Sequence, residues 1–188
     1  IHMPAAFAEP LKGTRFNWAY HSEPEPYMDE RAMYCPRGRV IGGSSSINGM
    51  AYVRGHARDY DRWAQTGLAG WDYAHCLPYF KRMESNQFGA GEYHGDAGPL
   101  CASHVATPHP LAKAFIEAGV EIGIPHNPDL NGERQEGIGP LQGSIRRGRR
   151  PNTGLPYLRS ARRRPNLTVI THATVDRILF DGSRAIGV

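Results

Sequence analysis

Residues 36–50 read PRGRVIGGSSSINGM, and their types and spacing suit close contact with a ligand. The pair Gly42-Gly43 has no Cβ atoms, so the main chain can approach a flat or charged group and adopt positive φ. The serines that follow add hydroxyls, and their amides can point at a phosphate. A flexible Gly/Ser linker is the alternative interpretation. A linker does not explain Ile47-Asn48 and the run AYVRG at set places, so we predict a binding turn.

Other residues that often carry chemistry form no convincing motif. Cys35, Cys76 and Cys101 are odd in number and include no C-x-x-C pair. This argues against a disulfide framework or a zinc site and favours a reducing compartment. The run GIGPLQG at 137–143 resembles a dinucleotide fingerprint, but its last glycine comes one residue late and Pro140 removes an amide. We therefore predict no metal site here and no phosphate cradle at 137–143.

Two helices are predicted in the middle of the chain. Asp72 can cap a helix over YAHCLPYFKRMES, with Pro78 near its start or at a kink. A second helix covers HPLAKAFIEAGVEIG, with Pro110 in its first turn and Gly123 near its end. Apolar residues recur on one face of that second helix at i, i+4, i+7 and i+11, which indicates amphipathic packing. They are Leu111, Phe115, Ala118 and Ile122.

The two ends of the chain differ in pattern. Residues 1–35 are aromatic and punctuated by proline, which indicates extended segments and loops. Residues 166–188 hold β-branched runs, and Asp181-Gly182 is the strongest short hairpin signal in the chain. Between them, residues 132–154 are rich in glycine, arginine and proline and predict long loops, which are often functional.

Composition describes an ordinary core-forming protein. The chain has 188 residues, 40% of them hydrophobic, and a formal charge of +4. Much of the positive excess lies between Arg146 and Arg164, and this local cluster is weak support for nucleic-acid binding. No apolar run approaches the roughly 20 residues of a membrane span. The start lacks the layout of a signal peptide and an initiator methionine, so we expect a piece of a longer protein.

The stretch from Gly38 to Asp61 resembles the first signature of the glucose-methanol-choline (GMC) oxidoreductases, a family of FAD-dependent alcohol-oxidising enzymes. Every position of that pattern is filled, from Gly38-Arg39 through Ile47-Asn48 to Asp61. The resemblance extends over nearly the whole chain, through RDYDRWA, YHGDAGPL, DLNG and RRPNLTVITHATVDRILFDG. It is closest to bacterial choline dehydrogenases and related alcohol dehydrogenases.

The resemblance implies the residues that contact FAD. In the family this stretch passes the pyrophosphate and runs beneath the flavin, and a later valine brackets the adenine part. On this chain the implied cofactor-binding residues are Val40, Gly42, Gly43, Ser44, Asn48, Gly49, Met50, Ala51 and Val175. For Val175 a role in a strand core is the alternative. Some family members attach FAD covalently through a histidine, but Ile47 stands at that place, so non-covalent FAD is expected.

Two family features are expected outside this chain. The dinucleotide fingerprint should precede Ile1, and the catalytic histidine with its histidine or asparagine partner should follow Val188. His56, His94 and His172 lie within family motifs but not at the base position, so bland structural roles are expected for them. We assign no catalytic residue within these 188 residues.

The implied fold is α/β, with α+β character in the substrate part: a doubly wound FAD-binding domain joined to an antiparallel-sheet substrate domain. Residues 1–98 are assigned to the FAD side, 99–160 to the substrate side and 161–188 to the FAD side again. The implied reaction is oxidation of a primary alcohol, choline-like or other, to an aldehyde by hydride transfer to flavin N5. The acceptor is oxygen, a quinone or another carrier. The expected location is cytoplasmic, with membrane association of the parent, its oligomeric state and the identity of the alcohol left open.

Two alternatives remain at this point. One is a basic module in which RRGRRP and RSARRRP hold nucleic acid or an anion, although these runs lack interleaved stacking aromatics. The other is an inactive excised fragment, with unpaired sheet edges and exposed apolar faces. We expect the isolated 188 residues neither to oxidise alcohols nor to hold FAD tightly.

Overall fold

The computed structural model describes residues 1–104 and 109–188, and its helices follow local capping signals. Helix α1 spans Ala57–Gln65, α2 Tyr73–Met83, α3 Pro110–Glu121 and α4 Arg159–Ala161, the last continuing a π-helical turn over Gly154–Leu158. Asp72 caps α2 by accepting a hydrogen bond from the backbone amide of His75 at 3.1 Å. Both predicted helices and the Asp72 cap are confirmed, but Glu84 and Ser85, predicted at the end of the first helix, lie in a strand, and His109 caps α3 instead of lying inside it. Helix α1 was not predicted.

The strands are short and form three small sheets. Tyr20–His21 (β1) pairs antiparallel with Tyr34–Cys35 (β2), and Leu179–Asp181 (β6) with Arg184–Gly187 (β7). The third sheet has the order β3-β4-β5, from Glu84–Asn86, Leu100–His104 and Gln142–Gly143. Strand β4 is parallel to β3 and antiparallel to β5. Helices and mixed sheets together make an α/β fragment, as expected.

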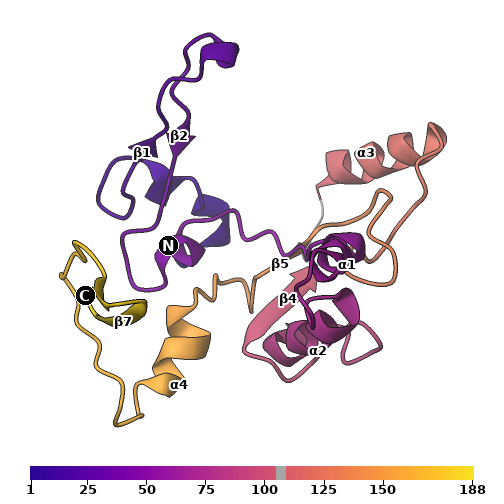
Figure 1. The fold of residues 1–188 in the computed structure, drawn as a ribbon. Coiled ribbons are helices and arrows are strands. Elements are labelled where there is room, and N and C mark those ends of the chain that lie inside the picture. The colour runs from indigo at the N-terminus through magenta and orange to yellow at the C-terminus, as the bar shows by residue number, and fades with distance from the viewer. Residues whose placement is uncertain (105–108) are drawn as a thin grey trace.

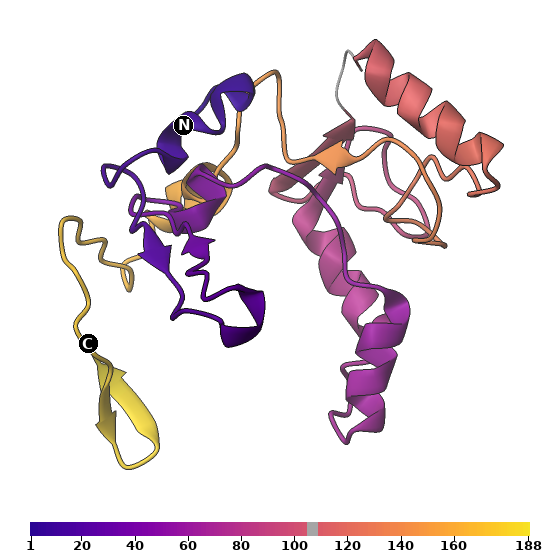
Figure 2. The same ribbon diagram turned by 90° about the horizontal axis from the view of Figure 1, so that it is seen from above.

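Two groups of elements lie on either side of a narrow middle (Figures 1 and 2). One holds the N-terminal turns, β1, β2 and the C-terminal β6–β7 hairpin. The other holds α1, α2, α3 and the β3-β4-β5 sheet. Two chain segments connect them, one after residue 47 and one before residue 150, and these are bridged by a hydrogen bond from Tyr52 N to Gln142 O at 2.8 Å. The segment expected to bind a ligand therefore runs into this connection.

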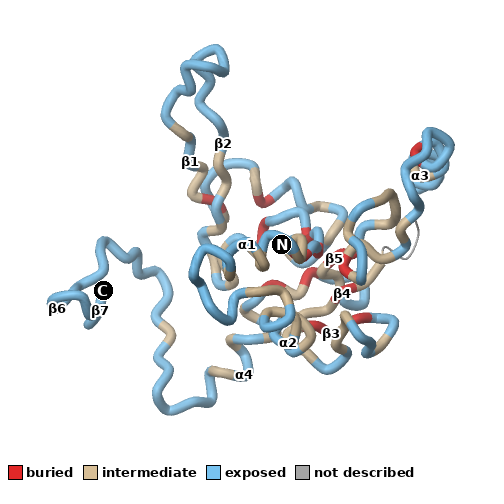
Figure 3. The backbone as a smooth tube through the Cα atoms, turned by 45° about the vertical axis from the view of Figure 1, so that its right-hand side comes forward, coloured by how far each residue is buried: buried red, intermediate tan, exposed pale blue. Residues whose placement is uncertain are grey.

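Burial is concentrated near the connection (Figure 3). The buried apolar residues are Ile47, Met50, Tyr52 and Ala102, and polar side chains such as Asn17, Glu84 and Arg150 are buried with them. The C-terminal hairpin and most of α3 are exposed. The described core is therefore small and unusually polar.

The orientation of α3 contradicts the predicted packing of its apolar face. Its predicted apolar face is exposed, with Leu111 and Phe115 both 72% accessible and Ile122 80%. The buried residue is Gly119, where a Cβ would lie 2.4 Å from Cδ1 of Ile138. Helical periodicity was right, but the described residues offer no surface that covers this face.

The C-terminal run also differs from its prediction. The hairpin forms, but its turn is Gly182-Ser183, because Asp181 already pairs with Arg184. Residues 165–178 form no strand, and Val175 is 59% exposed. A strand needs a partner for its backbone groups, and the described residues provide none beside this segment.

Candidate functional site

The turn after residue 41 needs its glycines for its own packing. Gly42 has φ +92° and Gly43 φ +53°, both in the left-handed half of conformational space. A Cβ on Gly38 would lie 2.1 Å from the carbonyl oxygen of Gly43, and one on Gly42 would lie 2.7 Å from Oγ of Ser46. The turn is therefore tightly closed rather than a flexible linker.

The serine hydroxyls hold this turn together from within. Ser46 Oγ donates to the carbonyl of Ile41 at 3.0 Å, and Ser45 Oγ donates to the carbonyl of Gly42. Ser44 Oγ accepts from the amide of Gly38 at 3.1 Å. The sequence suggested hydroxyls available to a ligand, but those of Ser45 and Ser46 donate to backbone carbonyls of the turn.

The next four residues present an open backbone surface. Asn48, Gly49 and Ala51 are exposed, and no atom lies within 4 Å of where a Cβ on Gly49 would stand. Met50 is buried at φ +63°, a conformation that a non-glycine residue adopts only when its surroundings hold it. The carbonyl of Met50 accepts from the amide of Ser144 at 2.8 Å. This part of the predicted cofactor segment is both accessible and rigidly held.

The glycine turn is held by hydrogen bonds from Arg150 and Thr153. Sequence reasoning missed both residues. The Arg150 guanidinium donates to Asn48 Oδ1 and Asn48 O, both at 2.6 Å, and to Ser45 O at 3.1 Å. Burial lowers the pKa of Arg150, whose exposure is 1%. The amide of Thr153 donates to Ser45 Oγ at 3.0 Å. No local signal separates Arg150 from its exposed neighbour Arg149.

A cleft of about 930 Å³ brings the glycine turn and the C-terminal run together. Val40, Ile41 and Gly38 line it from the turn, and Arg15, Phe16 and Trp18 from the N-terminal segment. Residues 170–174 close it on the C-terminal side. Val40 thus shares a cleft with the residues just before Val175, although Val175 itself is not part of the lining.

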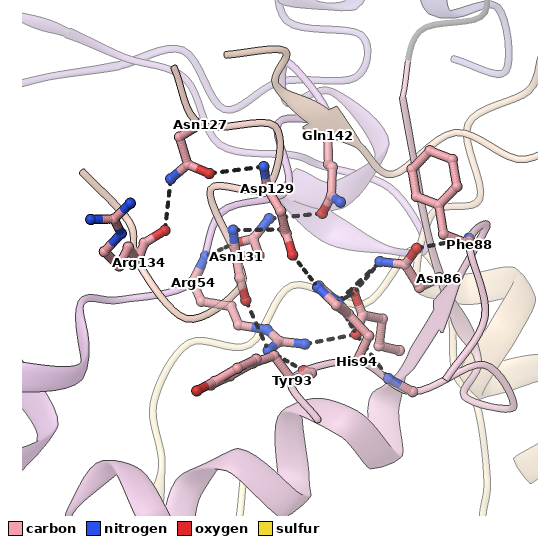
Figure 4. Close-up of polar contacts among 12 residues, drawn as sticks. Arg54, Asn86, Phe88, Tyr93, His94, Asn127, Asp129, Asn131, Arg134 and Gln142 are labelled. Carbon is pink, nitrogen blue, oxygen red and sulfur yellow. Dashed lines mark hydrogen bonds and ion pairs between the residues drawn. The ribbon is translucent and has the colours of Figure 1, made fainter. Parts of the chain in front are cut away.

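A second polar cluster surrounds the side chain of Arg54, in the group of elements that holds the β3-β4-β5 sheet (Figure 4). The guanidinium of Arg54 donates to Glu84 Oε2 at 2.7 Å, and their side chains are 3% and 0% exposed. His94 Nδ1 lies 3.0 Å from Glu84 Oε1, and His94 Nε2 lies 2.8 Å from Asp129 Oδ2. Two basic side chains and two carboxylates therefore form one connected cluster.

The pKa of Arg54 depends on its buried neighbours Tyr52 and Glu84. Burial alone would lower the pKa of Arg54, but contact with Tyr52 and the charge of Glu84 outweigh it, so the pKa is raised. Burial raises the pKa of Tyr52, and Arg54 offsets part of that rise. The cluster holds its cation more firmly in the charged state than an isolated guanidinium would be held.

Asn131 joins this cluster to the connection between the two groups. Its Nδ2 donates to Tyr52 O at 3.0 Å and to Gln142 Oε1 at 2.9 Å, while its Oδ1 accepts from the amide of Arg54 at 2.8 Å. One buried side chain thus fixes the strand-like segment that follows the predicted cofactor residues.

The three motif histidines have separate structural settings. His94 belongs to the charged cluster, and His56 caps α1 by accepting from the amide of Arg58. His172 lines the 930 Å³ cleft at φ +57°.

Within residues 1–104 and 109–188, no three His, Cys, Asp or Glu side chains are grouped as metal ligands. Helices in this described part are all too short or too polar to cross a membrane.

The chain matches the family model described as GMC oxidoreductase over residues 13–188. It is 54% identical to the oxygen-dependent choline dehydrogenase of Pseudomonas putida strain F1, over 99% of this chain and 34% of that protein. The Burkholderia multivorans enzyme of the same name is 53% identical over 99% of this chain and 33% of its own length. The chain spans about a third of the length of these curated relatives.

Solved structures agree with that match. Pyridoxine 4-oxidase from Mesorbium loti superposes with a TM-score of 0.90 at 36% identity, covering 98% of this chain and 36% of that one. An FAD-dependent oxidoreductase from Chaetomium thermophilum gives a TM-score of 0.85 at 28% identity, covering 99% of this chain and 34% of that one. The local architecture described above is therefore that of a known group of flavoenzymes.

Proposed function

This chain belongs to the GMC oxidoreductase family, and we propose that it supplies the central part of the FAD site of an enzyme that oxidises a primary alcohol to an aldehyde. The observation that carries the proposal is the closed glycine turn, which opens onto a cleft shared with the C-terminal run. The expected cofactor, FAD, agrees with the family match and with an FAD-dependent structural neighbour.

The residues present fit a dinucleotide cofactor. Close approach of backbone is needed along a pyrophosphate or beneath a flat ring, and Gly42 and Gly43 provide it. Residues 48–51 add an accessible backbone edge whose shape is fixed by Arg150 and Ser144. When bound, FAD supplies the redox chemistry by accepting a hydride from the alcohol carbon.

The proposed FAD contacts are the same residues that the sequence resemblance implies. Val40 holds the cofactor from the cleft, and Val175 follows the segment that closes the cleft's far side. Ile47 is 2% exposed and has no nucleophilic atom, which supports non-covalent attachment. The remaining proposed contacts are Gly42, Gly43, Ser44, Asn48, Gly49, Met50 and Ala51.

The work of these residues is binding and orientation rather than proton transfer. None of the described histidines is placed as a base in this proposal, so the alcohol proton goes to a residue outside the chain. Because the relatives are named as oxygen-dependent choline dehydrogenases, choline is the first substrate and oxygen the first acceptor to test, followed by quinones or other carriers. We propose a cytoplasmic location for the parent protein.

The domain division is also proposed. Residues 1–98 and 161–188 would belong to the FAD side and 99–160 to the substrate side. Strand β3 pairs with β4 across the 98/99 boundary, so these two parts would share a sheet rather than be joined by a free linker.

An absorbance spectrum between about 350 and 500 nm, where oxidised flavin absorbs, tests the proposal. We expect flavin bands to survive gel filtration in the full-length protein and choline or another primary alcohol to bleach them. The isolated 188 residues, mixed with FAD and then passed through gel filtration, should elute without flavin bands, because so much of their apolar surface is exposed. A full-length protein that retains no flavin would overturn the proposed function.

A further inference from the structure

Arg150 is a buried cation whose hydrogen-bond acceptors are all uncharged. Besides the oxygens of Asn48 and Ser45, its Nε donates to the carbonyl of Ile1 at 3.0 Å. Among residues 1–104 and 109–188, no carboxylate lies within ion-pair distance of it. Buried charges in proteins are usually paired, because leaving water is costly. The hydrogen bonds satisfy the guanidinium as a donor but leave its charge uncompensated.

The same side chain fixes the orientation of Asn48. Asn48 Oδ1 accepts from Arg150 Nη1 at 2.6 Å and from the amide of Met50 at 3.1 Å. Two donors on one atom identify it as the oxygen, which settles the amide orientation. The Nδ2 group of Asn48 makes no hydrogen bond to the described residues, and Asn48 is exposed. The Nδ2 group of Asn48 is therefore an oriented, exposed hydrogen-bond donor on the outer side of the turn.

We propose that Arg150 is a positioning residue that orients Asn48 toward the cofactor and, through its unpaired charge, raises the cofactor's reduction potential. This inference rests on the proposed function. An alcohol that becomes an aldehyde loses a hydride from carbon and a proton from oxygen. The hydride adds two electrons and one proton to the cofactor, which becomes more negative by one unit. A fixed positive charge behind the 45–48 turn favours that state.

The test is the midpoint potential of the full-length holoprotein, measured by dithionite titration against a reference dye. Arg150→Met removes the charge, and we expect about a tenfold shift toward the oxidised cofactor, which is about 30 mV lower for a two-electron couple. Arg150→Lys keeps the charge and should retain most of the parent potential. Arg149→Met removes an exposed charge one residue away and should leave the potential unchanged.

Three results would overturn the inference. One is an unchanged potential in a flavin-loaded Arg150→Met protein. Another is an equal fall in Arg150→Lys, which would mean that only packing matters. The third result applies if Arg150→Met does not fold, in which case Asn48→Asp is measured instead. Its carboxylate accepts the same hydrogen bonds and pairs with the guanidinium. An unchanged potential in Asn48→Asp would therefore also overturn the inference. A parent protein without flavin would refute the proposed function and is recognised before any variant is made.

Discussion

Arg54 and Arg150 are both buried arginines, 6% and 1% exposed, yet they are stabilised in opposite ways. Arg54 faces the carboxylate of Glu84, which also lies beside His94, and contact with its neighbours raises its pKa. Arg150 is held by neutral oxygens, and burial lowers its pKa. A compensated charge has little field left to act on a ligand, whereas an uncompensated one acts on whatever binds nearby. The first arrangement suits a structural lock and the second suits a cofactor site.

Removing the partner of Arg54 should have the largest effect. Glu84→Gln leaves a buried guanidinium without its counter-charge, and breaking such a pair costs about 3–5 kcal/mol. We expect a large fall in the melting temperature of the full-length protein, measured by circular dichroism. Glu92→Gln, at an exposed glutamate, is the matched control. Similar melting temperatures for the two variants would mean that the Arg54 cluster is not a structural lock.

The glycine turn beside Arg150 should respond more moderately. Gly42→Ala places a methyl 2.7 Å from Ser46 Oγ and keeps the unfavourable φ of +92°, at a cost of about 1–3 kcal/mol. Because the strain is in the turn itself, FAD affinity should fall together with the melting temperature. Gly43→Ala is the control for stability, since its Cβ would meet no protein atom within 4 Å and only the strain of about 1–2 kcal/mol for a left-handed residue applies. Equal falls in melting temperature in both variants would contradict the tight packing at Gly42.

A half-buried carboxylate, Asp72 at the N-terminal end of α2, gives the smallest effect. The backbone amide of His75, and then its side chain, hold the pKa of Asp72 below its usual 3.8. A depressed pKa stabilises the folded state above 3.8, and that stabilisation is lost as pH falls through the lower folded value. The melting-temperature advantage of the parent over Asp72→Asn should therefore shrink below about pH 4. A difference that is constant from pH 6 to pH 3 would show that the charge of Asp72 contributes nothing.

The accuracy of the sequence predictions follows the range of the interactions involved. Helices α2 and α3 were predicted because Asp72, Pro110 and Gly123 act within a few residues of the helix ends. Helix α1 was missed, since its cap is His56, outside the usual capping residues. The apolar face of α3 was given a packing role that the described residues do not provide. A strand was expected at Val175 from the β-branched runs and from the family resemblance, and none of the described residues pairs with it.

The candidate site divides in the same way. Sequence by itself determined the glycine turn, the family and hence the cofactor, because these depend on residue types at fixed spacing. Only the tertiary structure decided which arginines are buried and which partners they meet. Arg54 meets Glu84 across 30 residues, and Arg150 meets Asn48 across 102. Arg149 and Arg150 are the same residue type side by side, and only packing against Ser45 and Asn48 buries one of them, because burial depends on distant chain segments rather than on local propensity.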